Sequence, residues 1–462
     1  MPTPYGADRV TTPTHRHRIG ITRREILQVG YSGLLGLGLS SIARATAGQS
    51  PGSKSGPKSV ILVFLTGAAS QLETFDPKPD APAEIRGEFA SVATPVPGLR
   101  VCEHLPKLAA LANTYAVVRS FAHKDNNHTA ATHHLITGAH QPGVRFDKPL
   151  SRDDWPCYAA GVNYLRPRSD GVPTGVTLPT FLAEGPLVWP GQHGGFLGPR
   201  HDPWQINQDP NKADFKVDNL NPVAGLDVEQ LKDRVALLDA VNGQRSALAG
   251  TIEGRRLTDQ QKQAVSILMS GKVAKAFDIN QEPAAVRDRY GRHMFGQSLL
   301  LARRLVEAGV SVIQANMGRV QNWDHHGNIF PSLKKMLPPL DQAVAALLGD
   351  LSASGLLDET MVVVMGEFGR TPKISNAGRD HWAPCFSGLF AGAGVRGGQV
   401  IGKSDKVSAY PLTTPYSPDD LGATVYSVLG VNHETELRDR LNRPVQLNRG
   451  QVIRPLFTGA AG

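Results

Sequence analysis

Short, continuous apolar runs recur along the sequence and predict buried strands. The clearest run spans residues 60–65 and stops at Thr66-Gly67. Three further runs, at residues 115–120, 310–315 and 360–365, share its apolar and partly β-branched character. Such runs are typical of strands that are covered on both faces, as in a parallel sheet.

Apolar residues recur at helical spacing between these runs. Between residues 290 and 309, Leu299, Ala302 and Val306 share one side of a helix, and Arg304 lies on the opposite side. A second helix is predicted at about residues 341–354. Strands that alternate with helices favour an α/β fold, in which a mostly parallel sheet is covered on both faces and ligands bind at the carboxyl ends of the strands.

The N-terminal residues 1–47 have the pattern of a twin-arginine secretion signal. The pair Arg23-Arg24 precedes a weakly apolar stretch at residues 29–43, and Ala45-Thr46-Ala47 offers a small-residue cleavage site. The apolar stretch is shorter than the roughly 20 residues that span a bilayer. We therefore expect export through the twin-arginine translocase to the periplasm or the cell exterior, and no stable membrane span in the mature protein.

The rest of the chain reads as one domain behind a linker. Residues 48–58 are rich in Gly, Ser, Pro and Lys and predict a flexible linker. A single domain is expected over residues 59–458, with an insertion at about residues 141–285. The insertion is predicted from a stretch rich in Pro, Gly, Asn and Asp, followed by a polar helical pattern, and is expected to form a cap.

Composition and charge narrow the class of protein. The 462 residues are 40% hydrophobic and 19% charged, as in soluble globular proteins. Six arginines and two acidic residues in the predicted signal account for half of the net charge of +8. Without a long basic run, the remaining charge does not favour nucleic-acid binding. The three cysteines, Cys102, Cys157 and Cys385, are too far apart to indicate a disulfide framework.

Histidines and acidic residues gather just after the predicted strands. One such loop begins at His123 and Asp125, a second contains Asp324 and His326, and a third contains Glu367. Imidazole and carboxylate together favour Zn²⁺, Mn²⁺ or Fe over a purely oxygen-bound ion. If residues 324–326 are extended, Asp324 and His326 point to the same side and can share an ion. A single loop histidine is more often a surface or hydrogen-bonded residue, so only their joint position predicts a metal site.

Common catalytic motifs are absent from the sequence. It contains no Gly-x-Ser-x-Gly elbow, no phosphate-binding Gly-x4-Gly-Lys-Ser/Thr loop and no His-Glu-x-x-His zinc motif.

Several segments together resemble the secreted bacterial proteins grouped as domain of unknown function 1501, within the alkaline phosphatase and sulfatase superfamily. The resemblance covers nearly the whole chain after the signal. It is carried by SQLETFDPKP (70–79), EIRGEF (84–89), EHLP (103–106), WDHHGN (323–328), GEFGRTP (366–372) and GRDHW (378–382). It implies a three-layer α/β sandwich like that of alkaline phosphatase, and hydrolysis of phosphate or sulfate esters with the help of one or two divalent metal ions.

The resemblance also implies a set of metal ligands. Asp324 and His326 look like the Asp/His ligand loop of the superfamily, and Glu367 takes the place of an Asp that ends a late strand. His381 looks like the late histidine ligand, with Asp380 beside it. The ion implied is zinc, manganese or calcium.

The nucleophile departs from the superfamily pattern. Counting back from Thr137-Gly138, as in the sulfatase nucleophile helix, reaches His128, where no Cys, Ser or Thr stands. Either His128 is itself a nucleophile or a ligand, or the adjacent Thr129 attacks, or the chemistry has been lost. The metal-binding Asp that usually follows the first strand is also missing, since Thr66-Gly67-Ala68 stands there.

Three functions follow from this pattern. The first is an exported metal-dependent ester hydrolase acting on a small molecule or a glycan, in which Arg370 or Arg379 offsets the charge of the ester and His128 acts as nucleophile or general acid/base. The second is a non-catalytic envelope protein that binds sulfated or phosphorylated glycans in the same place. In the third, the histidines only make hydrogen bonds within loops.

Overall fold

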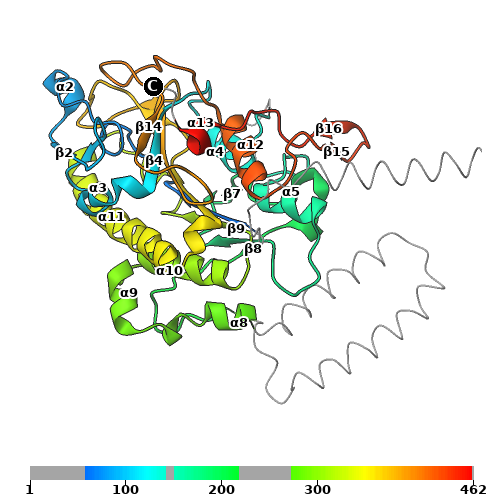
Figure 1. Ribbon diagram of the computed structural model, residues 1–462. Helices are drawn as coiled ribbons and strands as arrows, with labels where there is room; N and C mark the ends of the chain where they lie inside the picture. Colours follow the sequence, from blue (N-terminus) through cyan, green and yellow to red (C-terminus); the bar gives the residue numbers. More distant parts are fainter. Residues whose placement is uncertain (1–57, 142–149, 218–271, 460–462) are drawn as a thin grey trace, which may run out of the picture. The chain divides into compact units, whose positions relative to one another are not determined.

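The computed structural model describes residues 58–141, 150–217 and 272–459 (Figure 1). The predicted signal at 1–47, almost all of the predicted linker and the polar helical pattern at 228–270 lie outside the described residues. The described residues fall in one compact unit, Gly56–Gly462.

Eight strands form a central sheet in the order β14-β4-β13-β10-β1-β9-β5-β8. Their bounds are β1 (Ser59–Phe64), β4 (Tyr115–Phe121), β5 (Gly175–Leu178), β8 (Trp204–Gln205), β9 (Val312–Asn316), β10 (Thr360–Met365), β13 (Phe386–Ala391) and β14 (Gln399–Ile401). Neighbouring strands are parallel except where β13 pairs, antiparallel, with β10 and β4. The predicted mostly parallel sheet is therefore confirmed, and the four apolar runs form β1, β4, β9 and β10.

The strand β1 lies in the middle of the sheet and is buried along its whole length. It pairs with β9 on one side and with β10 on the other, so that Val60 lies opposite Val312 and Met361. Because side chains alternate along a strand, Ile61 joins one apolar cluster and Val60 joins the other. Both faces of the sheet therefore need a cover.

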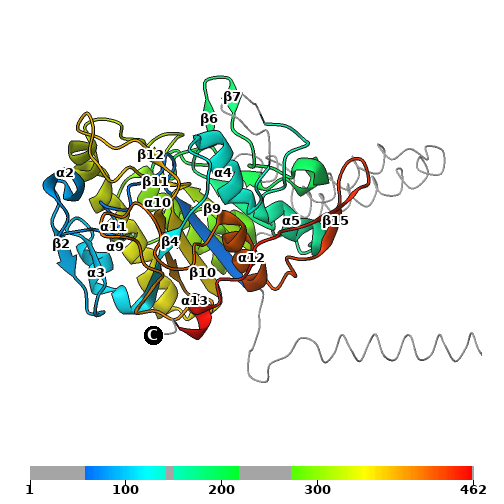
Figure 2. The same cartoon turned by 90° about the horizontal axis from the view of Figure 1, so that it is seen from above.

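Helices cover both faces and give the α/β sandwich its three layers (Figure 2). One face carries α3 (Pro106–Ala110), α8 (Lys272–Phe277), α9 (Ala284–Tyr290), α10 (Met294–Glu307) and α11 (Ile329–Ala353). The other carries α4 (His128–Thr137), α5 (Tyr158–Leu165), α12 (Pro418–Val428) and α13 (Pro455–Thr458). None of the described helices has the length and apolar composition that crossing a membrane requires.

The remaining elements are short. They are α2 (Ala83–Arg86), the strand pairs β2 (Ser91–Ala93) with β3 (Arg100–Cys102), β6 (Ala183–Glu184) with β7 (Leu187–Val188), β11 (Gly369–Arg370) with β12 (His381–Trp382), and β15 (Glu436–Arg438) with β16 (Pro444–Gln446), and single 3₁₀ turns at Ala112–Thr114, Gly195–Leu197, Pro199–His201, Ile279–Gln281 and Leu356–Asp358. Cys102, Cys157 and Cys385 are buried and unlinked.

The helix predicted at 341–354 is the second half of the longer helix α11, which passes through Pro338 and Pro339. A proline removes a hydrogen bond to the carbonyl four residues earlier. Those carbonyls belong to Lys334 and Lys335, which are exposed, so water can take the place of the missing donors. The prolines therefore do not end the helix.

The predicted insertion at 141–285 is not a separate cap in the part that the structure describes. Its strand β5 pairs with β9 in the central sheet, and β8 pairs with β5 at the edge. Its helix α5 belongs to the covering layer. The strand β5 is only four residues long and begins at Gly175, so its pattern is too short to stand out among the surrounding loops.

Candidate metal centre

Loops from three strands meet at one edge of the sheet. The strands β4, β9 and β10 run in the same direction, so their carboxyl ends lie together. His128 begins α4 after β4, Asp324 follows β9, and Glu367 follows β10. The short strand β12 adds His381. Ligands of sheets with this architecture bind at such an edge.

Asp324, His326 and His381 point three ligand atoms at one another. The Oδ1 atom of Asp324 lies 2.9 Å from Nε2 of His326 and 3.4 Å from Nε2 of His381. The two Nε2 atoms are 3.1 Å apart. Three ligands on one tetrahedral zinc ion stand about 3.3 Å from one another, given metal–ligand distances of about 2.0 Å. The triangle therefore has the dimensions of one face of a tetrahedral metal site.

Hydrogen bonds at Nδ1 orient the imidazoles of His326 and His381 as metal ligands. The Nδ1 atom of His381 lies 2.7 Å from the carbonyl oxygen of Asn126 and must donate to it. The Nδ1 atom of His326 lies 2.7 Å from Oδ1 of Asp380. A neutral imidazole that donates through Nδ1 presents a lone pair at Nε2. Two lone pairs thus face each other at Nε2, an arrangement that a cation stabilises and a neutral pair of histidines does not.

His128 lies at the centre of this edge, buried between two carboxylates. Its Nδ1 is 2.6 Å from Oε1 of Glu367, and its Nε2 is 3.2 Å from Oδ2 of Asp324. Burial alone would lower the pKa of His128, but the two carboxylates outweigh burial and raise it to about 9. Without a metal ion, His128 is therefore an imidazolium at neutral pH. Its ring also stacks on that of Trp189, which is fully buried.

Glu367 does not take the predicted place of a metal ligand. Its carboxylate accepts hydrogen bonds at 3.0 Å from the backbone N–H groups of both Gly67 and Ala68. It also holds Nδ1 of His128, and it is fully buried. The turn after β1, which lacks the superfamily's Asp, thus binds the carboxylate of Glu367 and orients His128 through it. Gly67 adopts a φ of +95°, where a side chain would be strained.

Arg370 is a buried residue that contacts the metal centre through Asp324. Its Nη1 lies 2.6 Å from Oδ1 of Asp324, and its Nε donates to the carbonyl oxygen of Ala68 at 2.8 Å. Burial of Asp324 alone would raise the pKa of its carboxyl, but the hydrogen bond from His128 and the charge of Arg370 lower it well below its usual range. Arg370 is 1% exposed. It therefore keeps Asp324 ionised, and it does not face a substrate as predicted.

Arg379 lies outside the site. Its guanidinium forms a buried ion pair with Glu73 and donates to the carbonyl oxygens of Ile85, Thr371 and Pro372. It is fully buried, so the structure does not bring it to the metal centre, where it was predicted to offset the charge of an ester. The partner that determines this placement lies 306 positions away in the chain, where sequence patterns give no signal.

The other predicted residues have clear places. Thr129 is fully buried on α4, and its hydroxyl has no hydrogen-bond partner among the described residues. Asp380 is largely exposed and orients His326 rather than facing the triangle. Two contributions were not predicted: the carbonyl of Asn126 and the ring of Trp189. The loop cluster that contains Asn126 was evident in the sequence, but nothing there indicated a backbone contact.

A comparison with protein-family models identifies the family. The model of the family described as "Protein of unknown function (DUF1501)" matches residues 57–457. No curated protein matches the chain.

The chain is also similar to several solved structures. The phosphonate monoester hydrolase SpPMH from Silicibacter pomeroyi shares 12% identity, with 88% of this chain and 78% of that chain covered and a TM-score of 0.39. The PsFucS1 sulfatase from Pseudoalteromonas sp. shares 12% identity over 90% and 73% of the two chains, with a TM-score of 0.36. The alkaline phosphatase from the Antarctic bacterium TAB5 shares 12% identity over 81% and 99%, with a TM-score of 0.34.

Proposed function

The chain belongs to the DUF1501 family, and from the geometry of its metal centre we propose that it is an exported, metal-dependent hydrolase of phosphate or sulfate esters. The observation that carries the proposal is the triangle of Asp324, His326 and His381, whose facing atoms are 2.9 to 3.4 Å apart. Export rests on the sequence pattern of residues 1–47. Esters of small molecules and esters of glycans carry the same reacting group, so both are candidate substrates.

Each residue of the centre has a chemical part in this proposal. Asp324, His326 and His381 hold the ion. Of zinc, manganese and calcium, zinc fits best, because two of the three ligands are imidazoles. A divalent cation supplies Lewis acidity toward an ester oxygen and toward water. Asp380 and the carbonyl of Asn126 fix the two imidazole rings.

His128 is the residue that moves a proton. Glu367 holds its Nδ1 at 2.6 Å, which leaves Nε2 as the atom that gives or accepts a proton, or that attacks. Because Arg370 and Arg379 are bound to other protein groups, the positive charge that faces an ester anion comes from His128 and the cation. The buried hydroxyl of Thr129 is not placed to attack.

The proposal predicts that removing a ligand removes both metal and activity. The zinc-loaded protein is expected to hydrolyse members of a panel of aryl phosphate and sulfate esters, and Asp324→Asn or His381→Ala to lower kcat/KM at least about 100-fold. His128→Gln is expected to retain the metal but to lower kcat by about 100-fold or more. Turnover rates and metal content measured on the same preparations test this.

A half-buried histidine outside the centre gives the matched control. His433→Ala is expected to keep both activity and metal content. The proposal fails if the metal-loaded protein turns over no ester on the panel, or if His128→Gln and Asp324→Asn leave the rates unchanged.

One observation favours a second function, a non-catalytic envelope protein that binds sulfated or phosphorylated glycans. The turn Thr66-Gly67-Ala68 offers backbone N–H groups to Glu367 instead of a carboxylate to a second metal ion. Calorimetry with an ester-bearing glycan, followed by mass spectrometry of the ligand, distinguishes the two. Tight binding of an ester that is recovered intact supports the binding protein, and release of free phosphate or sulfate supports the hydrolase.

A further inference from the structure

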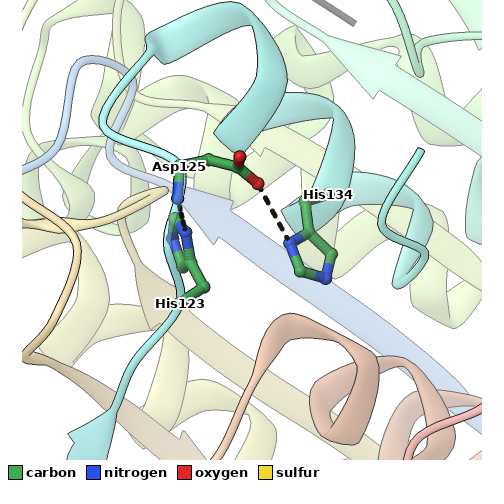
Figure 3. A group of neighbouring side chains, drawn as sticks. All are labelled: His123, Asp125 and His134. Carbon is green, nitrogen blue, oxygen red and sulfur yellow. Dashed lines mark hydrogen bonds and ion pairs between the residues drawn. The ribbon is translucent and has the colours of Figure 1, made fainter. Parts of the chain in front are cut away.

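A second group of histidines and acids lies next to the metal centre without sharing a ligand with it. Figure 3 shows its members: His123 and Asp125 come from the loop after β4, and His134 comes from α4. Each side chain offers one ligand atom, and these atoms lie within 4.8 Å of one another.

The hydrogen bonds of His123 define its tautomer. Its Nε2 lies 2.7 Å from the carbonyl oxygen of Glu367, which can only accept, so Nε2 carries the proton. The single lone pair of its Nδ1 accepts from the backbone N–H of Asp125 at 3.1 Å, so a cation bound there takes the place of this hydrogen bond. Burial keeps His123 neutral, because it lowers the pKa to about 4.

His134 is held in the same way. Its Nε2 lies 2.6 Å from Oδ2 of Asp419 at the start of α12. Its Nδ1 is buried and has no hydrogen-bond partner among the described residues. The nearest carboxylate oxygen, Oδ2 of Asp125, is 3.8 Å away, which is too far for a hydrogen bond. Two atoms at this separation can instead be ligands of one ion.

We propose that His123, Asp125 and His134 bind a second divalent cation, with zinc the best match for the ligand set. In metal sites, a ligating histidine almost always donates its other ring N–H to a carboxylate or a backbone carbonyl, and both histidines here do so. His140, whose Nε2 lies 3.5 Å from the same oxygen of Asp125, is placed to be a fourth ligand.

The charges of the group also call for a cation. Asp125 and Asp419 bring two negative charges, and within the described residues their ion pairs are all with histidines. With neutral imidazoles, a divalent ion balances these charges. The alternative is a proton on His134, since the two carboxylates outweigh its burial and raise its pKa. The distance of 3.8 Å between Nδ1 of His134 and Oδ2 of Asp125 favours a metal ion over a proton on His134.

The second ion is expected to stabilise the metal centre formed by Asp324, His326 and His381. His123 binds the backbone carbonyl of Glu367, and the side chain of Glu367 holds His128. An ion that fixes His123 therefore fixes the end of β10 from which Glu367 extends.

Metal stoichiometry tests the proposal in the full-length protein. Zinc content per chain is measured after dialysis against a weak chelator, and Co²⁺ substitution reports tetrahedral coordination through its visible absorption. His134→Ala is expected to bind one zinc ion fewer than the unaltered protein, and Asp125→Asn to bind it at least about tenfold more weakly. His433→Ala is the control and is expected to lose no zinc.

Variants of the two sites separate this inference from the proposed function. Asp324→Asn is expected to remove a different ion, so the double variant Asp324→Asn/His134→Ala loses both. If the catalytic centre binds no metal, the loss caused by His134→Ala still stands by itself. The inference is overturned if His134→Ala and Asp125→Asn bind as much zinc, as tightly, as the unaltered protein. Should His134→Ala fail to fold by circular dichroism, the nearly isosteric Asp125→Asn decides.

Discussion

His128 couples the chemistry of the metal centre to the stability of the fold. The side chain is 3% exposed and lies between the carboxylates of Asp324 and Glu367, each of which is itself largely buried. A buried imidazole in such a place is stabilising when it carries a proton and becomes a weaker partner when it loses it. The same side chain is therefore a source of both reactivity and pH dependence.

The raised pKa of His128 predicts a loss of stability in mild alkali. Its pKa rises from 6.5 to about 9 on folding, so its contribution is fully present below about pH 6.5 and is lost as the pH rises through about 9. The metal-free protein, kept in chelator, is expected to unfold at lower urea concentrations at pH 9 than at pH 6.5. The change in unfolding free energy is a few kcal/mol at most.

The substitution His128→Gln provides the comparison. A glutamine has no proton to lose in this range, so the variant is expected to show a flatter dependence of its urea midpoint on pH. Equal slopes for the two proteins would show that other groups cause the effect.

At the scale of elements, α11 does more than cover the sheet, because it also caps another helix. The helix α3 has no side-chain cap of its own at Leu105. Asp341, near the middle of α11, instead accepts from the backbone N–H groups of Leu108 at 2.8 Å and Lys107 at 3.0 Å. A carboxylate at the start of a helix satisfies N–H groups that have no partner within the helix.

Removing this cap is expected to be costly. Asp341→Ala leaves two backbone donors without their carboxylate and is expected to lower the unfolding free energy by about 1–3 kcal/mol. Urea denaturation monitored by circular dichroism measures the loss. Lys335→Ala, an exposed position on the same helix, is the control and is expected to change stability by less than about 0.5 kcal/mol. A similar loss in both variants would contradict the cap.

An element could be predicted from the sequence when its own residues formed a clear hydrophobic pattern. The strands β1, β4, β9 and β10 were predicted because each is a continuous apolar run. The strand β13 was missed because its six residues include Ser387 and Gly388. The first half of α11 was missed because Pro338 and Pro339 resemble a helix end.

At the scale of the whole molecule, Arg379 ties distant segments together. Its side chain binds Glu73, after β1, and the carbonyl of Ile85 in α2, while its backbone N–H binds the carbonyl of His325. The side chain of Arg379 has no exposed surface. Such a residue supports the loops of the metal centre without touching it.

Replacing Arg379 is therefore expected to destabilise the protein strongly. Arg379→Met leaves the carboxylate of Glu73 buried and uncompensated, and is expected to cost about 3–5 kcal/mol. Arg438→Ala breaks an exposed pair with Glu436 and is expected to cost less than about 1 kcal/mol. Thermal denaturation of both variants measures the difference. Similar melting temperatures would show that the buried pair carries little stability.

The site was predictable as a set of residue types but not as a set of roles. The sequence placed Asp324 and His326 in a loop after a strand, the family resemblance added His381, and these three side chains do converge. It did not separate residues that face the centre from those that support it, such as Glu367 and Arg370. That distinction depends on hydrogen bonds between positions about 300 residues apart, for which a single sequence carries no pattern.

The central position of β1 has a consequence for how the chain folds. This first strand forms its pairs with β9 and β10, which are made from residues 312–316 and 360–365. Contacts between such distant positions require closure of long loops, which slows folding. During synthesis, the middle of the sheet can assemble only after most of the chain has left the ribosome, because β1 can pair only once β9 and β10 have been made.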